Sequence, residues 1–130
     1  MSHASTLLSL LQHVVRAADS ARSADQALRS GAALVCAATG LRGGEPVATR
    51  PGGTASRAAA TGAPAVDDGP APADGLLVAV PVLVRGNAAL VLGFRADRRP
   101  NLMTLATLGA VGSALGRAVE RERAAGIQAA

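Results

Sequence analysis

The sequence is nearly devoid of aromatic side chains: Phe94 is the only one in 130 residues, and tryptophan and tyrosine are absent. Apolar residues still make up 49% of the chain, so a hydrophobic core has to be built mainly from leucine, valine and alanine. Aromatic rings are the usual anchors for flat ligands and the surfaces on which nucleic-acid bases stack. Their scarcity argues against both kinds of binding.

Lysine is also absent, and all 13 basic residues are arginines, which against 9 acidic residues give a net charge of +4. A basic balance of this kind can indicate a nucleic acid or an anionic membrane as partner. The arginines are scattered from Arg16 to Arg123, however, and the densest group is the pair Arg98-Arg99. We therefore expect no nucleic-acid partner.

A single cysteine, Cys36, excludes an internal disulfide and a cysteine-based zinc site. His3, His13 and Cys36 do not have the spacing of metal ligands, so we expect no metal and no other cofactor. Residues 1–16 lack the basic leader and cleavage site of a secretory signal. The longest uncharged run, residues 100–116, is shorter than the roughly 20 apolar residues of a membrane helix. We expect a cytoplasmic protein without a membrane span.

The length is typical of one domain, which we assign to residues 1–130. Apolar residues at three- and four-residue spacing predict two helices within residues 5–40. The first runs to about Asp19. The second begins at the capping box formed by Ser23 and Gln26, and it ends at Gly40, a residue type that favours the left-handed position after a helix.

Residues 41–75 contain most of the prolines and few large apolar side chains, so we expect irregular structure there. A connection of this length is uncommon without local structure. The composition favours a short helix over residues 54–61, ended by Gly62, and a short strand near Val66.

Residues 76–95 predict a β-hairpin, because two valine- and leucine-rich runs flank a turn at Gly86-Asn87. Pro81 has no N–H to donate, which places it at a sheet edge or a bulge. Both runs are continuously apolar, and this is typical of strands that are covered on both faces.

Residues 101–124 predict a long final helix that is apolar on two sides. The sheet can cover one side, and the first helix or a second copy of the chain can cover the other. The small residues Gly109, Gly112, Ser113 and Gly116 would allow a neighbouring helix to approach closely. The whole chain thus predicts an α+β fold, an α/β sandwich with a small antiparallel sheet flanked by N- and C-terminal helices.

Three stretches of the chain resemble one family. Residues 53–68 (GTASRAAATGAPAVDD) resemble a short helix followed by the turn "tG.P..v.D" and a strand. Residues 76–87 (LLVAVPVLVRGN) resemble the strand "s.lavPl...g", and residues 105–123, which end in GRAVERER, resemble a last helix that often reads "lG.ave..r". With the first two helices they cover most of the chain, which therefore resembles a GAF domain of bacterial signalling proteins.

The resemblance implies an antiparallel sheet with helices on one side and a homodimer formed through the first and last helices. The interface residues it suggests are Leu7, Leu11, Leu108, Gly112, Leu115 and Val119. The family usually has a strand hairpin between Gly40 and Gly53. This chain has only a short segment there, with Val47-Ala48 as its apolar pair, so we expect a smaller sheet and a shallow or absent pocket.

Candidate ligand-binding residues lie near the start of the short helix, where backbone N–H groups point outward and can meet an anion. They are Arg50, Thr54, Ser56, Arg57 and Asp67. A solvated loop is the alternative interpretation of the same residues. Cys36 lies beside a buried stripe without a positioned histidine, which favours a small core residue over a nucleophile. We identify no catalytic residue.

The sequence thus favours a non-enzymatic sensory or regulatory domain, of GAF or profilin-like architecture, that dimerises and signals through another protein. The alternative is a ligand-free dimeric adaptor, either a degenerate GAF domain or a roadblock or profilin-like scaffold. A small enzyme is a third hypothesis, which the lack of a nucleophile–base pair disfavours.

Overall fold

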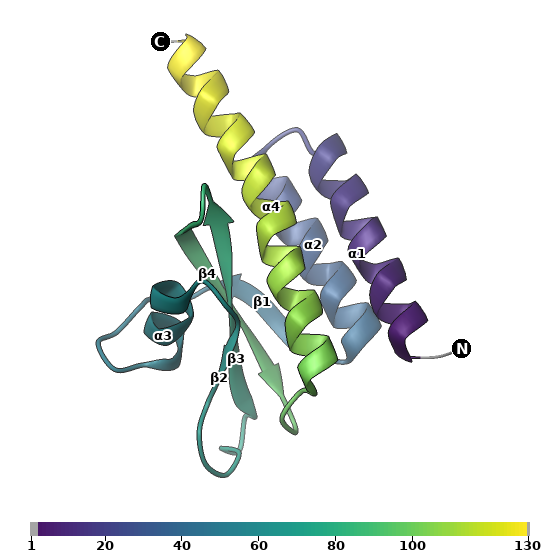
Figure 1. Ribbon diagram of the computed structural model, residues 1–130, viewed down its shortest axis with the longest axis vertical. Helices are drawn as coiled ribbons and strands as arrows, with labels where there is room; N and C mark the ends of the chain where they lie inside the picture. The colour runs from purple at the N-terminus through teal and green to yellow at the C-terminus, as the bar shows by residue number, and fades with distance from the viewer. Residues whose placement is uncertain (1–2, 130) are drawn as a thin grey trace.

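The computed structural model describes residues 3–129, which form four helices and one four-stranded antiparallel sheet (Figure 1). This confirms the α+β class. The sheet has the strand order β1-β4-β3-β2. In chain order the elements are α1 (His3–Ser20), α2 (Ala24–Thr39), β1 (Arg42–Pro46), α3 (Thr54–Thr61), β2 (Ala65–Val66), β3 (Leu76–Val84), β4 (Asn87–Ala96) and α4 (Leu102–Ala129).

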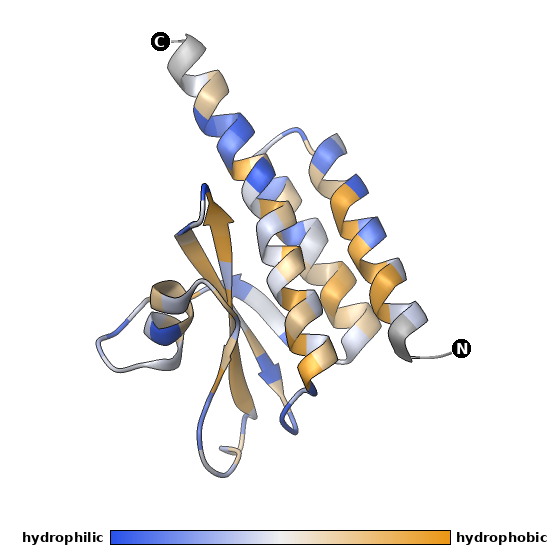
Figure 2. Cartoon of the chain, in the orientation of Figure 1, coloured by the Kyte–Doolittle hydropathy of each residue, from blue (hydrophilic) through white to orange (hydrophobic). Residues whose placement is uncertain are grey.

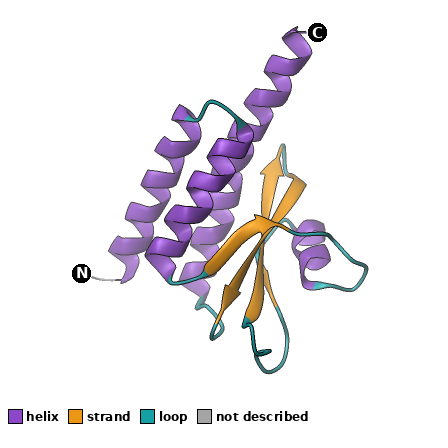
Figure 3. Ribbon diagram, turned by 180° about the vertical axis from the view of Figure 1, so that it is seen from behind, coloured by secondary structure: helices purple, strands orange, loops and turns teal. Residues whose placement is uncertain are grey.

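The helices are divided unequally between the two faces of the sheet. Figures 1 and 3 show α1, α2 and α4 on one side and the short helix α3 alone on the other. Within the larger group, α4 contacts β3 and α2 contacts β1, while α1 packs on α2 and α4. α1 therefore forms the outer wall of the helix layer, and together with α2 it covers part of the apolar surface of α4 that faces away from β3.

Local signals set the ends of the helices as expected. Ser23 caps α2, and its side-chain oxygen accepts a hydrogen bond from the backbone N–H of Gln26 at 3.1 Å. The Gln26 side chain in turn accepts from the N–H of Arg22 at 2.7 Å. Gly40 and Gly62 end α2 and α3 in the left-handed conformation, with φ of +78° and +71°.

The strands of the hairpin alternate between two hydrophobic layers, so both of its faces are covered as predicted. Figure 2 shows apolar residues along the two long strands and along much of α1. Ala79 and Val91 pack under α3. The residues that face the helix layer include Val78, Val80, Val82, Leu92, Phe94 and Ala96.

The expectation of irregular structure immediately after Gly40 is wrong, because residues 42–46 form strand β1. β1 pairs with β4, with Arg42 opposite Arg95 and Pro46 opposite Leu92, and its register shifts between Gly43 and Glu45. The segment has no apolar alternation, and Gly43 and Gly44 have φ of +90° and +102°. Its extended form therefore comes from pairing with β4, which local sequence patterns do not report.

The hairpin turn lies one residue earlier than predicted. Val84 pairs with Asn87, so the two-residue loop is Arg85-Gly86, with φ of +53° and +81°. These signs are those of a type I′ turn, in which arginine is an unusual first residue. Arg85 also donates from Nε to Glu120 Oε1 at 2.9 Å, which ties the turn to α4.

Pro81 lies at a sheet edge, as predicted. Leu77 directs its N–H and its C=O towards the β2 side, where they bond to Asp67. Strand alternation points Pro81, four residues later, to the same side. The pairing with β2 extends only to Ala79, so the missing N–H of Pro81 costs no ladder hydrogen bond.

The expectation that glycines of α4 receive a neighbouring helix is wrong for Gly112 and Gly116, because they face a strand. A Cβ added at Gly112 would overlap the carbonyl oxygen of Pro81, and one added at Gly116 would overlap that of Leu83. The glycine that brings two helices together is instead Gly31 of α2, whose added Cβ would lie 2.7 Å from Leu115 Cδ2. Gly109 faces Pro64.

The substitution Gly116→Ala should lower the free energy of unfolding by about 2 kcal/mol or more, because the atom it strikes is a backbone oxygen that cannot rotate away. Gly126→Ala, in the same helix with open space around it, is the control. It should be neutral or stabilise by up to about 1 kcal/mol through helix propensity. Urea denaturation followed by circular dichroism measures both. Equal stability of the two variants would contradict the close approach.

Candidate functional site

Asp67 joins the start of α3 to strands β2 and β3. Thr54, the first residue of α3, donates from Oγ1 to Asp67 Oδ1 at 2.5 Å. The Leu77 N–H donates to Asp67 Oδ2 at 3.0 Å, and the Asp67 N–H donates to the Leu77 carbonyl at 3.0 Å. Both carboxylate oxygens of Asp67 therefore have internal donors.

Arg57 completes this network from the next turn of α3. Its Nη2 donates to the Val66 carbonyl at 2.9 Å and to Thr54 Oγ1 at 3.3 Å, and its Nη1 lies 3.7 Å from Asp68 Oδ2. The structure thus brings together three predicted ligand-binding residues: Thr54, Arg57 and Asp67. Their polar groups already have hydrogen-bond partners within the chain, and these bonds hold α3 on the sheet.

The other two predicted ligand-binding residues lie apart from this network. Arg50 is in the exposed turn before α3, where its carbonyl accepts from the Gly53 N–H at 2.9 Å. Ser56 is half-buried on α3. In the described part of the chain, neither side chain hydrogen-bonds to Thr54, Arg57 or Asp67. The five residues therefore do not converge on one site.

The hydrogen bonds of Asp67 also set its protonation. Partial burial by itself raises the pKa of the Asp67 carboxyl, but the bonds from Thr54 and the Leu77 N–H, with the charges of Arg95 and Arg57, outweigh it. The net result is a pKa below the ordinary value for aspartate. Such a carboxylate remains ionised at neutral pH and is a poor proton donor.

The interface between α3 and the sheet is closed by small side chains. Ala55 and Ala58 of α3 are buried against Ala79 and Val91. Val47, Ala59 and Ala65 pack around this cluster. α3 therefore rests directly on the strands.

Most residues suggested for the dimer interface lie in the core of a single chain. Leu108 and Leu115 are 0% exposed, Leu7 is 3% and Val119 is 6%, and Gly112 is buried against β3. The chain's own helices and sheet cover them. Leu11 alone in that set remains half-exposed.

An open apolar surface does exist beside these residues, on α1 and α4. A cleft of about 610 Å³ lies between α1, α4 and the hairpin turn, and Leu11 of α1 lines it. Leu8, one helical turn before Leu11 on the same side of α1, is 60% exposed. We call this surface the α1–α4 face, formed by Leu8, Leu11, Val15, Ala106, Ala110 and Ser113. The three α4 residues follow i, i+4, i+7 spacing, which places them on one side of the helix.

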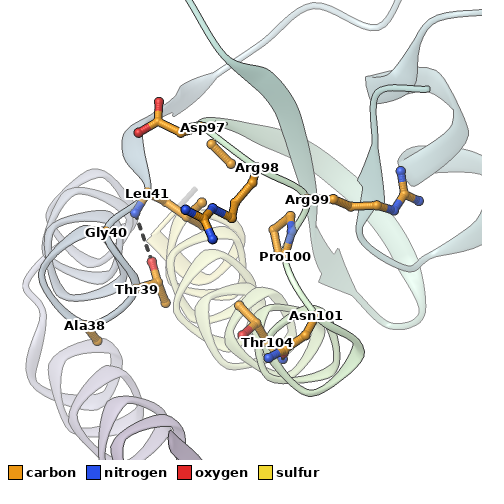
Figure 4. Close-up of a pocket in the computed structure, with 11 residues that line it drawn as sticks. Ala38, Thr39, Gly40, Leu41, Asp97, Arg98, Arg99, Pro100, Asn101 and Thr104 are labelled. Carbon is orange, nitrogen blue, oxygen red and sulfur yellow. Dashed lines mark hydrogen bonds between the residues drawn. The ribbon is translucent and has the colours of Figure 1, made fainter. Parts of the chain in front are cut away.

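A second cleft, of about 450 Å³, lies where the end of α2 meets the β4–α4 connection (Figure 4). Thr39 and Leu41 form its wall at the α2 end, and the Leu41 N–H donates to Thr39 Oγ1 at 3.2 Å. Asn101 caps α4 at the opposite wall, where its Oδ1 accepts from the Thr104 N–H at 2.8 Å. Sequence reasoning did not find this cleft, because its walls lie about 60 residues apart in the chain.

Cys36 is half-buried, and burial raises the pKa of its thiol, the opposite of what an activated nucleophile requires. Its Sγ lies 3.5 Å from the Gly43 carbonyl oxygen, to which it can donate. Among the residues that the structure describes, no three His, Cys, Asp or Glu side chains gather as a metal site.

The segment Leu102–Gly126 of α4 is long and apolar enough to cross a membrane by length and composition. Half of its most apolar stretch is buried inside the chain, however, and core helices of soluble proteins share this character.

No protein-family model matches the chain, and neither a curated protein nor a solved structure matches it.

Asp67→Asn should destabilise the fold by about 1 kcal/mol at pH 7, because it weakens charge-assisted hydrogen bonds that are only partly shielded from water. The folded-state pKa is lowered, so the stabilisation is complete above the unfolded-state value near 3.9 and disappears as the pH falls through the folded-state value. The difference between the native chain and this variant should therefore shrink between pH 7 and about pH 3.

The control is Asp68→Asn, since Asp68 is exposed and makes only a 3.7 Å ion pair with Arg57. This variant should remain within about 0.5 kcal/mol of the native chain. Urea denaturation at several pH values measures the three proteins. A pH-independent effect of Asp67→Asn, or an equal effect of both variants, would exclude the assigned role of Asp67.

Proposed function

We propose that this chain is a non-enzymatic, GAF-like regulatory domain that forms a cytoplasmic homodimer through α1 and α4 and signals through a partner protein. The proposal rests on the position of the open apolar surface, which lies on α1 and α4 and not beside α3. The α3 side of the sheet is closed by Ala55 and Ala58. The outer sides of α1 and α4, in contrast, leave a mainly apolar cleft, which Arg85, Arg117 and Glu120 also line.

The chemistry of the α1–α4 face supports self-association. Leu8, Leu11 and Val15 offer branched side chains on α1, while Ala110 and Ser113 offer a shallow surface on α4. In a twofold dimer the same patch occurs on both subunits, so the branched side chains of one copy can fill the shallow surface of the other. The four helices would then pack as a bundle.

The two ionisable groups with shifted pKa values support a role without catalysis. Asp67 is an ionised carboxylate held by internal donors, and Cys36 has a raised pKa. Neither is poised to exchange a proton near neutral pH. The resemblance to GAF domains agrees with a regulatory role.

A ligand-free structural adaptor is the second candidate, and one observation favours it. Thr54, Arg57 and Asp67 hold α3 on the sheet through hydrogen bonds, and alanines fill the space beneath the helix. An adaptor of this kind would dimerise but would show no change of melting temperature with small molecules.

Ala106→Arg should shift the protein from dimer to monomer, because it places a long charged side chain on the α1–α4 face. A buried unpaired charge costs several kcal/mol, enough to weaken association at least 100-fold. The matched control is Ala60→Arg, another exposed helical alanine, which lies on α3. Sedimentation equilibrium measures the mass, and circular dichroism checks that both variants are folded.

A native chain that is monomeric at about 100 μM, a concentration well above the Kd of a stable dimer, would refute the proposed homodimer. So would a dimer that Ala106→Arg leaves intact. Loss of the dimer in Ala60→Arg instead would move the interface to the α3 side.

A further inference from the structure

Arg98 lines the cleft at the end of α2, and its charge is not paired with an acidic side chain among the described residues. Figure 4 shows the Arg98 side chain reaching across the cleft towards Leu41 and Thr39. Within the described residues, Arg98 has no ion pair and no side-chain hydrogen bond. Its guanidinium therefore presents its donors to whatever enters the cleft.

The neighbouring charges have partners and point away. Asp97, which follows β4, is turned outward in Figure 4 and accepts from Arg42 Nη1 at 2.9 Å. Arg99 points in the opposite direction and donates from Nη1 to the Asp67 carbonyl at 3.4 Å. Since the only acid of the cleft wall is paired with Arg42, Arg98 gives the cleft a net positive charge.

The two helix ends that meet at the cleft do not decide this charge. The N-terminus of α4 is positive and the C-terminus of α2 is negative, so their dipoles oppose each other. The Thr39 hydroxyl is also engaged, because it donates to the Val35 carbonyl at 2.6 Å. The charge and direction of Arg98 are what distinguish this cleft.

The remaining walls limit the size and kind of ligand. Apolar contacts come from Ala38, Leu41, Ala96 and Pro100, and the volume of about 450 Å³ suits a small molecule. No aromatic ring lines the cleft, so it lacks the usual platform for a nucleobase or another flat ring. Guanidinium groups recognise carboxylates and phosphates through two parallel hydrogen bonds.

We propose that this cleft binds a small oxyanion, the carboxylate or phosphate group of an aliphatic metabolite, through the guanidinium of Arg98. The site is distinct from the α1–α4 face and from the Asp67 network. The proposal goes beyond the proposed function, since it holds whether or not the chain dimerises.

The test is a titration of the ¹⁵N-labelled chain with sodium phosphate and, separately, with sodium succinate, each at an ionic strength held constant with sodium chloride. We expect saturable shifts of the amide resonances of residues 38–41, 97–99 and 101–104, with a Kd on the order of 1 mM. A response to phosphate alone assigns a phosphate ester, a response to succinate alone assigns a carboxylate, and a response to both supports the shared chemistry.

Arg98→Ala should weaken binding at least tenfold, while Arg99→Ala is the matched control and should retain it, because Arg99 points away from the cleft. Both changes are at exposed side chains, and the amide spectrum itself reports whether each variant is folded. Arg98→Lys should recover part of the affinity through charge alone. Absence of saturable shifts up to 50 mM, or an equal loss in the Arg98 and Arg99 variants, would overturn the proposal.

Discussion

The close approach of α4 to the backbone of β3 is the constraint on which the rest of the structure depends. Gly112 and Gly116 bring the helix against the carbonyl oxygens of Pro81 and Leu83, nearer than any side chain would permit. Leu108 and Leu115 are thereby placed deep between sheet and helices and become fully buried. Part of the apolar surface of α4 that faces away from β3 packs on α1 and α2.

Small side chains also allow close packing on the other face of the sheet. A chain with one aromatic residue cannot separate its layers with bulky rings, so α3 contacts the strands through alanines. The Thr54–Asp67 hydrogen bonds and Arg57 hold the short helix in place. The two clefts described above lie elsewhere, one beside α1 and α4 and one where α2 and β4 end.

Features determined by neighbouring residues could be predicted from the sequence, and those determined by distant contacts could not. The capping of α2 by Ser23, the end of α3 at Gly62 and the α+β class follow from local rules. β1 was missed because its extended conformation depends on β4. The orientation of Arg98 was equally hidden, because nothing in the sequence distinguishes it from Arg99, although one points into a cleft and the other away from it.

The edges of the sheet have a consequence for how the protein avoids aggregation. Exposed strand edges can recruit strands from other chains, because they offer free N–H and C=O groups. Beyond β2, the β3 edge offers Pro81, which has no donor, and carbonyls that lie under the glycines of α4. β1 is five residues long, with a register shift and a terminal proline. Neither edge presents a regular ladder, so neither is a good template for a strand from another molecule.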